Sequence, residues 1–205
     1  ALLRAVGVIL AALPPAAKAR ARDEGLIAPL VQAVFRQGYA PGGYLTGAAH
    51  PSAFDGDRID LDRLIDIAQR QSAQTLPPMV RLSVRRETPP EPGRTRFSGG
   101  LSERVFDTPS AIARVHRRTD REMTITLSAA ATRDPNGRPL RFAWRVLRGD
   151  AARIRIAPSA DGRVATVTIP WHAPHAVPGD PARRTHRVDI GVFAHNGAEW
   201  SAPAF

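Results

Sequence analysis

The hydrophobic residues change their spacing at Pro77, and this change constrains the fold more than any other feature of the chain. Before Pro77, apolar residues recur every three or four positions, which is typical of amphipathic helices. After it they alternate with polar residues, which is typical of strands with one buried face. We therefore expect a mainly β fold: an α-helical segment over residues 1–75, followed by an antiparallel β-sandwich over residues 77–205.

The first helix is predicted from an apolar stripe between Leu2 and Leu13, and a proline pair ends it at Pro14. Residues 1–19 also imitate a secretion signal, since they combine an apolar run with an A-x-A ending. Helical spacing, and an arginine at position 4, favour a helix with one buried face. A signal peptide is the alternative interpretation.

Two further helices are predicted before Pro77. The apolar residues from Ile27 to Phe35 share one side, and Gly38 is a candidate for the stop signal after them. The third helix follows Asp60, a good N-cap residue. A Gly-rich connector joins the two helices.

Several strands with intervening turns are predicted after Pro77, at the spacing expected of a sandwich. Residues 134–137, with the sequence Asp-Pro-Asn-Gly, form a turn before an alternating strand that delivers Trp144 into the core. Asn196-Gly197 is a strong hairpin signal.

Two stretches break this strand pattern. Residues 87–118 form a Pro/Gly-rich insertion, in which a short helix is predicted to begin at Asp107 or Thr108 with Pro109 in its first turn. The stretch "WHAPHAVPGD", beginning at Trp171, is predicted to be a flexible loop because it is rich in proline.

Composition limits the partners of this chain. Its net charge of +10 arises from 29 basic and 19 acidic residues, but the arginines are scattered and no aromatic-and-basic RNA-binding signature accompanies them, so we expect no nucleic-acid partner. No apolar run reaches the ~18 residues of a membrane span. With no cysteine, there is neither a disulfide framework nor a thiolate zinc site.

Residues 120–205 resemble the polycystic-kidney-disease (PKD) type and cadherin-like immunoglobulin-fold modules. The match rests on a D-P-x-G-x-P-L turn, the aromatic strand with Trp144 and the later Asn-Gly hairpin. Asn136 and Arg138 replace acidic positions of the family and His195 an aspartate, which weakens a calcium-binding inference. The resemblance implies a spacer or binding platform in a larger bacterial protein and favours a periplasmic or extracellular location.

A second, weaker resemblance rests on the same residues. It is to the C-terminal sandwich that follows nucleoside-hydrolase-like domains in polysaccharide-degrading bacterial proteins. It implies that a catalytic domain precedes this chain in a longer protein. Residues 1–75 resemble no family that we recognise.

The connector before the third helix contains the densest polar chemistry. His50 with Asp55 and Asp57 is the candidate acid–base or metal cluster. A helix cap and an Asp-Gly turn explain most of these acids without chemistry, and the spacing fails as a calcium loop.

The remaining candidates are aromatic and basic residues of the second half. Trp171 and Trp200 could stack on sugar rings, and Arg183 with Arg184 could hold an acidic glycan. The alternative is that both indoles fill the ends of the sandwich. His172 and His175, with His186 downstream, could ligate a metal, but no third ligand is recognisable by spacing, so we expect neither a metal nor a cofactor.

No nucleophile motif, phosphate-binding loop or H-E-x-x-H pattern occurs, so we expect no catalytic residues in this chain. Two functions follow. The first is a non-catalytic sandwich module acting as a spacer or as a binding platform for carbohydrate. The alternative is the C-terminal part of a nucleoside-hydrolase-like or polysaccharide-degrading hydrolase, whose partner is its own upstream domain.

Overall fold

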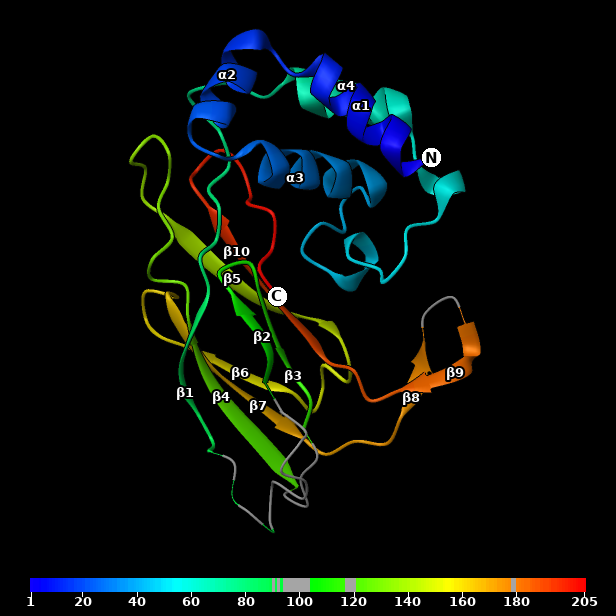
Figure 1. The fold of residues 1–205 in the computed structure, drawn as a ribbon, viewed down its shortest axis with the longest axis vertical. Coiled ribbons are helices and arrows are strands. Elements are labelled where there is room, and N and C mark those ends of the chain that lie inside the picture. Colours follow the sequence, from blue (N-terminus) through cyan, green and yellow to red (C-terminus); the bar gives the residue numbers. More distant parts are fainter. Residues whose placement is uncertain (90, 92, 94–103, 117–120, 178–179) are drawn as a thin grey trace. The chain divides into compact units, whose positions relative to one another are not determined.

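The structure is a computed structural model that combines helices in its first part with antiparallel sheets in the rest (Figure 1). Strand residues make up 32% and helical residues 26% of it, so helices contribute almost as much as strands and the chain combines both. The structure describes residues 1–89, 91, 93, 104–116, 121–177 and 180–205.

The chain divides into two compact units that interleave along the sequence. We call them the helical unit, residues 1–79, 133–141 and 193–202, and the strand unit, residues 80–132, 142–192 and 203–205. The predicted division at residue 76 differs from this one, because the turn at 133–141 and the last hairpin belong with the helices.

Four α-helices and two short 3₁₀ helices form most of the helical unit. They are α1 (Leu2–Ala12), α2 (Pro15–Asp23), α3 (Ile27–Tyr39), η1 (Gly47–Ala49), η2 (Gly56–Arg58) and α4 (Leu61–Gln69). Figure 1 shows α1, α3 and α4 packed beside one another. Asp60 caps α4 as predicted, since its carboxylate accepts a hydrogen bond of 3.0 Å from the Arg63 N–H.

The predicted stripe of α1 is buried in part. Ala5, Ile9 and Leu13 lie in the core of the helical unit, whereas Leu2 and Leu3 are exposed. Among the described residues, no single helix has both the length and the apolar character to cross a membrane. Only α1 and α2 taken together have them, and the chain bends by 107° between these two helices.

The predicted helix stop at Gly38 is wrong, because α3 continues to Tyr39. The glycine serves close packing instead. A Cβ atom at position 38 would lie 2.4 Å from the Leu64 Cδ2 atom of α4, so any larger residue would force the buried Leu64 side chain to shift.

The two predicted turns meet within the helical unit. Gly137 has a φ of 71°, and its N–H bonds to the Asp134 carbonyl, which closes the first turn. The Asn196 side chain is 2% exposed and donates to the Leu76 carbonyl at 2.8 Å and to Asp134 Oδ1 at 2.7 Å. The second chain reversal is confirmed by pairing of His195 with Trp200.

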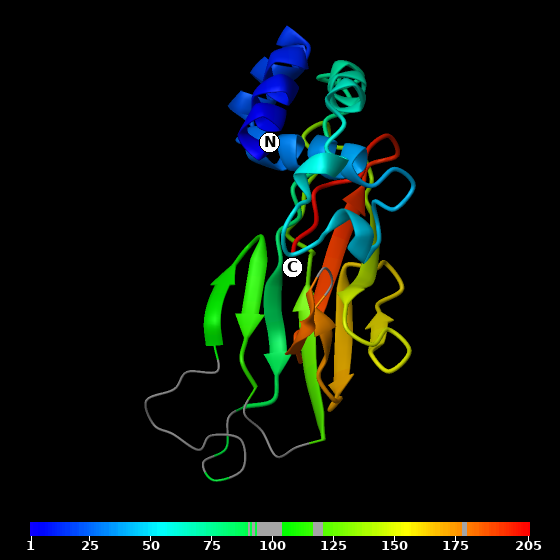
Figure 2. The same ribbon diagram turned by 90° about the vertical axis from the view of Figure 1, so that its right-hand side faces the viewer.

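Antiparallel sheets form the strand unit (Figure 2), with β10 and the start of β5 extending into the helical unit. The strands are β1 (Ser83–Glu87), β2 (Arg104–Thr108), β3 (Ala111–Arg114), β4 (Glu122–Ser128), β5 (Arg141–Arg148), β6 (Arg155–Pro158), β7 (Val164–Pro170), β8 (His175–Val177), β9 (Asp180–Thr185) and β10 (Asp189–His195). One sheet has the order β1-β4-β7-β6, and three pairs are β10-β5, β2-β3 and β8-β9.

The core of the strand unit is built by alternation, as the sequence predicted. Ile125 and Leu127 of β4 are buried with Ala165 and Val167 of β7, while the threonines between them are half-buried. Trp144 is buried, and its indole N–H donates to the Gly162 carbonyl at 2.8 Å.

The predicted short helix in the insertion is wrong, because the segment is the β2–β3 hairpin. Thr108 accepts a bond from the Ala111 N–H across its turn rather than capping a helix. Phe205, from the far end of the chain, bonds to the Ser110 carbonyl and to the Ile112 N–H. The rest of the insertion lies partly outside the described residues.

The predicted loop after Trp171 is also wrong in part. Its second half forms the β8–β9 hairpin, in which His175 pairs with Thr185 and Ala176 with Arg184. The residues at the tip of the hairpin, 178 and 179, lie outside the described part of the chain.

Candidate functional site

The predicted cluster around His50 is a buried structural network. His50 is only 5% exposed, and its ring packs against Phe193 at 5.4 Å between centroids. Its Nε2 atom lies 2.6 Å from the Tyr44 carbonyl, which can only accept, so Nε2 carries the proton. Nδ1 then accepts a bond of 3.0 Å from the Arg36 guanidinium.

The pKa of His50 is lowered to about 4, mainly by burial; the bond to the Tyr44 carbonyl opposes this shift, and the positive charge of Arg36 adds to it. Burial also raises the pKa of the Tyr44 phenol, whose hydroxyl donates to the Ser201 carbonyl at 2.7 Å. His50 is therefore neutral at physiological pH, and its two ring nitrogens are engaged, so it is poorly suited to act as a general base.

The two acids of this cluster have a different role. Asp55 is exposed and caps the short helix η2, where its carboxylate accepts from the Asp57 N–H at 3.0 Å. Asp57 is exposed as well. The acids thus belong to a surface turn, as the cap-and-turn interpretation of this connector predicts.

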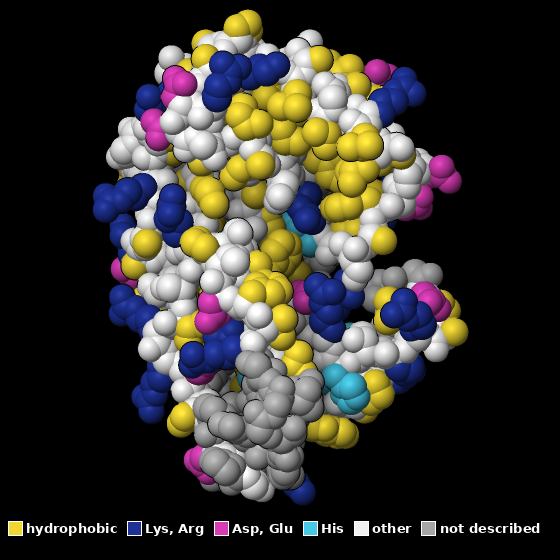
Figure 3. Space-filling view, viewed as in Figure 1, with side chains coloured by type: hydrophobic (Ala, Val, Ile, Leu, Met, Phe, Trp, Pro, Cys, Tyr) yellow, Lys and Arg dark blue, Asp and Glu magenta, His cyan; other side chains and the backbone are white. Residues whose placement is uncertain are grey.

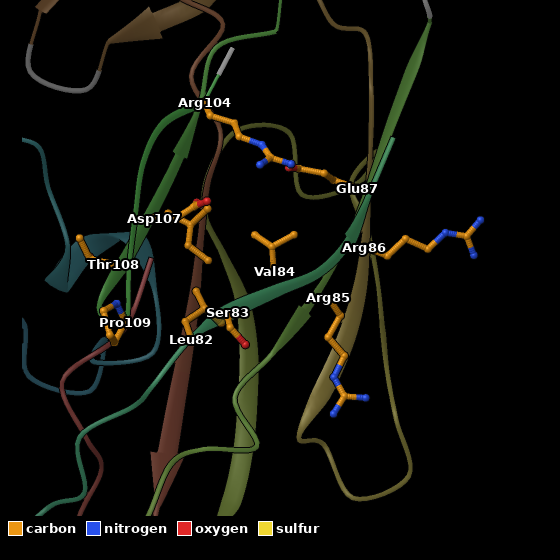
Figure 4. A pocket seen from close by; sticks show the side chains of 11 residues that line it. Leu82, Ser83, Val84, Arg85, Arg86, Glu87, Arg104, Asp107, Thr108 and Pro109 are labelled. Carbon is orange, nitrogen blue, oxygen red and sulfur yellow. The ribbon is translucent and has the colours of Figure 1, made fainter. Parts of the chain in front are cut away.

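A groove of about 600 Å³ lies in the strand unit between β1 and the β2–β3 hairpin (Figure 4). Val84 points into it toward Asp107, whereas Arg86 points away. β1 is an edge strand of its sheet, and next to it the Leu82 N–H donates to the Pro109 carbonyl of the turn between β2 and β3 at 2.7 Å. The groove is lined by Leu82, Ser83, Val84, Arg85, Arg86, Glu87, Arg104, Asp107, Thr108, Pro109 and Ile112.

A network of four charges closes one side of this groove. The Arg114 side chain is only 7% exposed and bonds to Glu87 at 2.8 Å and to Asp107 at 2.6 Å. Arg104 also pairs with Glu87, at 2.5 Å. The network joins β1 to β2 and β3 through side chains that lie up to 27 residues apart.

Both carboxyl groups of the network are held in the ionised form. A hydrogen bond from Arg114 lowers the pKa of Asp107. Burial alone would raise the pKa of Glu87, but its bonds to Arg114 and Arg104 outweigh burial and lower the pKa. Neither group suits general-acid chemistry, so the network is best explained as a clasp between strands.

The two candidate tryptophans have different environments and belong to different units. Trp171 is 63% exposed and follows β7 directly, where its N–H donates to the Arg121 carbonyl at 2.6 Å. Trp200 is half-buried, and its indole packs on the His195 ring at 4.6 Å. Trp171 is exposed and can stack on a ligand, whereas the half-buried Trp200 fits the alternative that its indole is a packing residue.

Arg183 and Arg184 lie on β9 and are exposed. The Arg184 guanidinium donates to the Pro174 carbonyl, three residues after Trp171. The second half of the "WHAPHAVPGD" stretch and this arginine pair are therefore parts of one local structure. Figure 3 shows basic side chains in separate groups on the face in view, without one continuous basic patch.

Three histidines meet beside this hairpin. The His172 ring lies 5.8 Å from the His175 ring and 6.0 Å from the His186 ring, measured between centroids. The sequence named all three residues, but their spacing did not show that His186 joins the other two. Among the described residues, no group of three or more His, Cys, Asp or Glu side chains is placed so that it could hold a metal ion.

No family model matches the chain, and no curated protein or solved structure matches it.

Proposed function

We infer that this chain is a non-catalytic module whose strand unit is an immunoglobulin-like β-sandwich and whose exposed Trp171 binds an acidic polysaccharide. The observation that carries this proposal is the 63% exposure of an indole at the end of a sheet strand. An indole that is exposed on a backbone-bonded residue is held in place and is open to stacking by a ligand.

The sandwich is supported by backbone bonds that link the short sheets. The β2–β3 hairpin bonds to Phe205, the neighbouring Ala204 pairs with Val192 of β10, and β10 pairs with β5. These links support a second sheet beside the four-stranded sheet β1-β4-β7-β6. The buried Trp144 fits the core position that the PKD-type resemblance implies.

The ligand class follows from the residues next to Trp171. An indole face stacks on the apolar face of a sugar ring, and guanidinium groups pair with carboxylates or sulfates. Arg183 and Arg184 supply two such groups on β9. The Arg184 contact with Pro174 keeps one of them close to the segment that begins at Trp171.

The test is native affinity electrophoresis of the chain in gels that contain neutral or acidic polysaccharides, at low and at moderate salt. We expect retardation by the acidic polysaccharide that survives moderate salt. Trp171→Ala should weaken binding about tenfold or more, as expected for an aromatic residue at the centre of a binding site. Arg183→Ala with Arg184→Ala should weaken it as well and reduce its salt dependence.

Trp200→Ala is the matched control, because it removes the same side chain from a half-buried position packed on His195. Retardation that disappears with salt and does not respond to Trp171→Ala would reduce binding to the net charge and contradict the proposal. An absence of retardation in every gel would contradict it as well and leave a spacer.

The alternative, the C-terminal part of a hydrolase, has less support from the helical unit. It requires His50 to contribute to an active site with Asp55 and Asp57. His50 instead bonds to Tyr44 and Arg36, and Asp55 caps a surface turn. This alternative stays a prediction.

A further inference from the structure

Two buried nitrogen atoms without partners stand out in the strand unit. Within the described part of the chain, His172 Nε2 and His175 Nε2 are the only buried side-chain nitrogen or oxygen atoms that lack a hydrogen bond. Buried polar atoms are almost always bonded, since leaving one unpaired costs free energy. That both exceptions lie on neighbouring rings, 5.8 Å apart, points to one common missing partner.

The other ring nitrogens show what kind of partner is missing. His172 Nδ1 lies 3.3 Å from the Pro170 carbonyl and His186 Nδ1 lies 3.1 Å from the His172 carbonyl. Since a carbonyl only accepts, the Nδ1 atoms of His172 and His186 carry a proton, and in the neutral ring their Nε2 atoms present a lone pair. Metal-binding histidines have this arrangement, with the second ring N–H donated to a carbonyl group.

The spacing of the rings fits a shared ion. A nitrogen–metal bond of about 2.0–2.1 Å places each ring centre about 3.2 Å from the ion, so two rings on one ion lie about 5–6 Å apart. The observed separations are 5.8 Å and 6.0 Å.

We propose that His172 and His175 bind a divalent transition-metal ion such as Zn²⁺ through their Nε2 atoms, with His186 as the third ligand. As the three side chains are placed, they do not form a group that could hold a metal ion. The proposal therefore requires the His186 ring to turn about its side-chain bonds, with solvent in the remaining position, as in open three-histidine sites. Imidazole nitrogens select zinc, copper or nickel over calcium or magnesium.

Nearby arginines are the main argument against a cation. Two of them are engaged elsewhere: Arg184 donates to the Pro174 carbonyl, and Arg187 pairs with Asp189 at 2.6 Å. An ordered water molecule is the other partner that could satisfy the two nitrogens. The experiment separates these two occupants.

The test uses the whole chain without an affinity tag, freed of metal with a chelator and titrated with Zn²⁺ in a calorimeter and with Co²⁺ in a spectrophotometer. We expect one ion per chain and visible Co²⁺ absorption. His172→Ala and His175→Ala should each weaken the affinity roughly tenfold or more, because even outer-shell partners of metal ligands are worth 10–100-fold. Retention of the fold is checked for each variant by circular dichroism.

His116→Gln is the control, because it removes an exposed histidine outside the group. Equal weakening in His116→Gln and His172→Ala would overturn the proposal and show adventitious binding to surface histidines. No binding of either metal would overturn it as well and leave water as the partner. Loss of metal binding in both His172→Ala and His175→Ala, with His116→Gln unchanged, supports the proposal. This test contains no polysaccharide, so its outcome does not depend on whether the chain binds one.

Discussion

The histidine of the helical unit and the histidines after β7 carry the same imidazole group, but their hydrogen bonding differs. At His50, both ring nitrogens have partners, the Tyr44 carbonyl and the Arg36 guanidinium. At His172 and His175, the Nε2 atoms are buried as well, yet neither has a hydrogen-bond partner. The first histidine is fully hydrogen-bonded within the chain, and the other two are not.

This difference shows that burial alone does not identify a functional histidine. His50 has a strongly lowered pKa in a connector full of acids, and these features would select it as a catalytic candidate. Its bonds instead explain it as a packing element. The residues after β7 attract less notice by sequence, but their unsatisfied atoms call for a partner.

The largest expected effect is on the stability of the helical unit. Leucine at position 50 fills similar space but cannot bond, so it leaves the Tyr44 carbonyl and one Arg36 N–H without their partner. We expect His50→Leu to lower the free energy of unfolding by about 3 kcal/mol, measured by urea denaturation at neutral pH.

His116→Gln provides the reference for this measurement. Because its side chain is exposed, His116→Gln should change the free energy of unfolding much less than His50→Leu does, by about 1 kcal/mol at most. If His50→Leu costs no more than that, then His50 is not a packing element, and a chemical role for the connector becomes the better explanation.

The next effect is a dependence of stability on pH. The pKa of His50 falls from about 6.5 in the unfolded chain to about 4 in the folded one. Between these values the unfolded state binds more protons, so stability is lost as the pH falls. We expect wild type to lose about 2 kcal/mol more than His50→Gln between pH 7.5 and pH 5, from urea denaturation at both values.

The comparison with His50→Gln isolates this histidine, because all other titrating groups are present in both proteins. The lowered pKa values of Glu87 and Asp107 keep these carboxylates ionised over the same range. Parallel pH profiles for the two proteins would show that His50 can take up a proton in the folded state.

Local signals allowed much of the fold to be predicted. The Asp60 cap, the break at Pro14 and the turn at Gly137 depend on residues next to each other in the sequence. The β2–β3 hairpin could not be predicted in this way. It bonds to Phe205, more than ninety residues away, and the local Thr-Pro signal favoured a helix.

The candidate sites were harder to predict for the same reason. The sequence named Trp171, Arg183 and Arg184, but exposure separates Trp171 from Trp200, and only the structure gives exposure. The groove between β1 and β2 was missed, since its clasp joins Glu87 to Arg114 across the insertion. No motif marks an ion pair of this separation.

The smallest expected effect completes the comparison of the two kinds of histidine. In a chelating buffer, His175→Leu replaces an unpaired buried nitrogen with apolar atoms, which removes a desolvation cost instead of a hydrogen bond. We expect the free energy of unfolding to change by less than about 0.5 kcal/mol, or to rise, in urea denaturation beside His50→Leu. If the free energy of unfolding instead falls by about 3 kcal/mol, His175 Nε2 has a hydrogen-bond partner without metal. His50 and His175 would then both be packing residues. A change near zero, together with Zn²⁺ stabilisation of wild type and not of His175→Leu, would show that the site is kept for a ligand and not for folding.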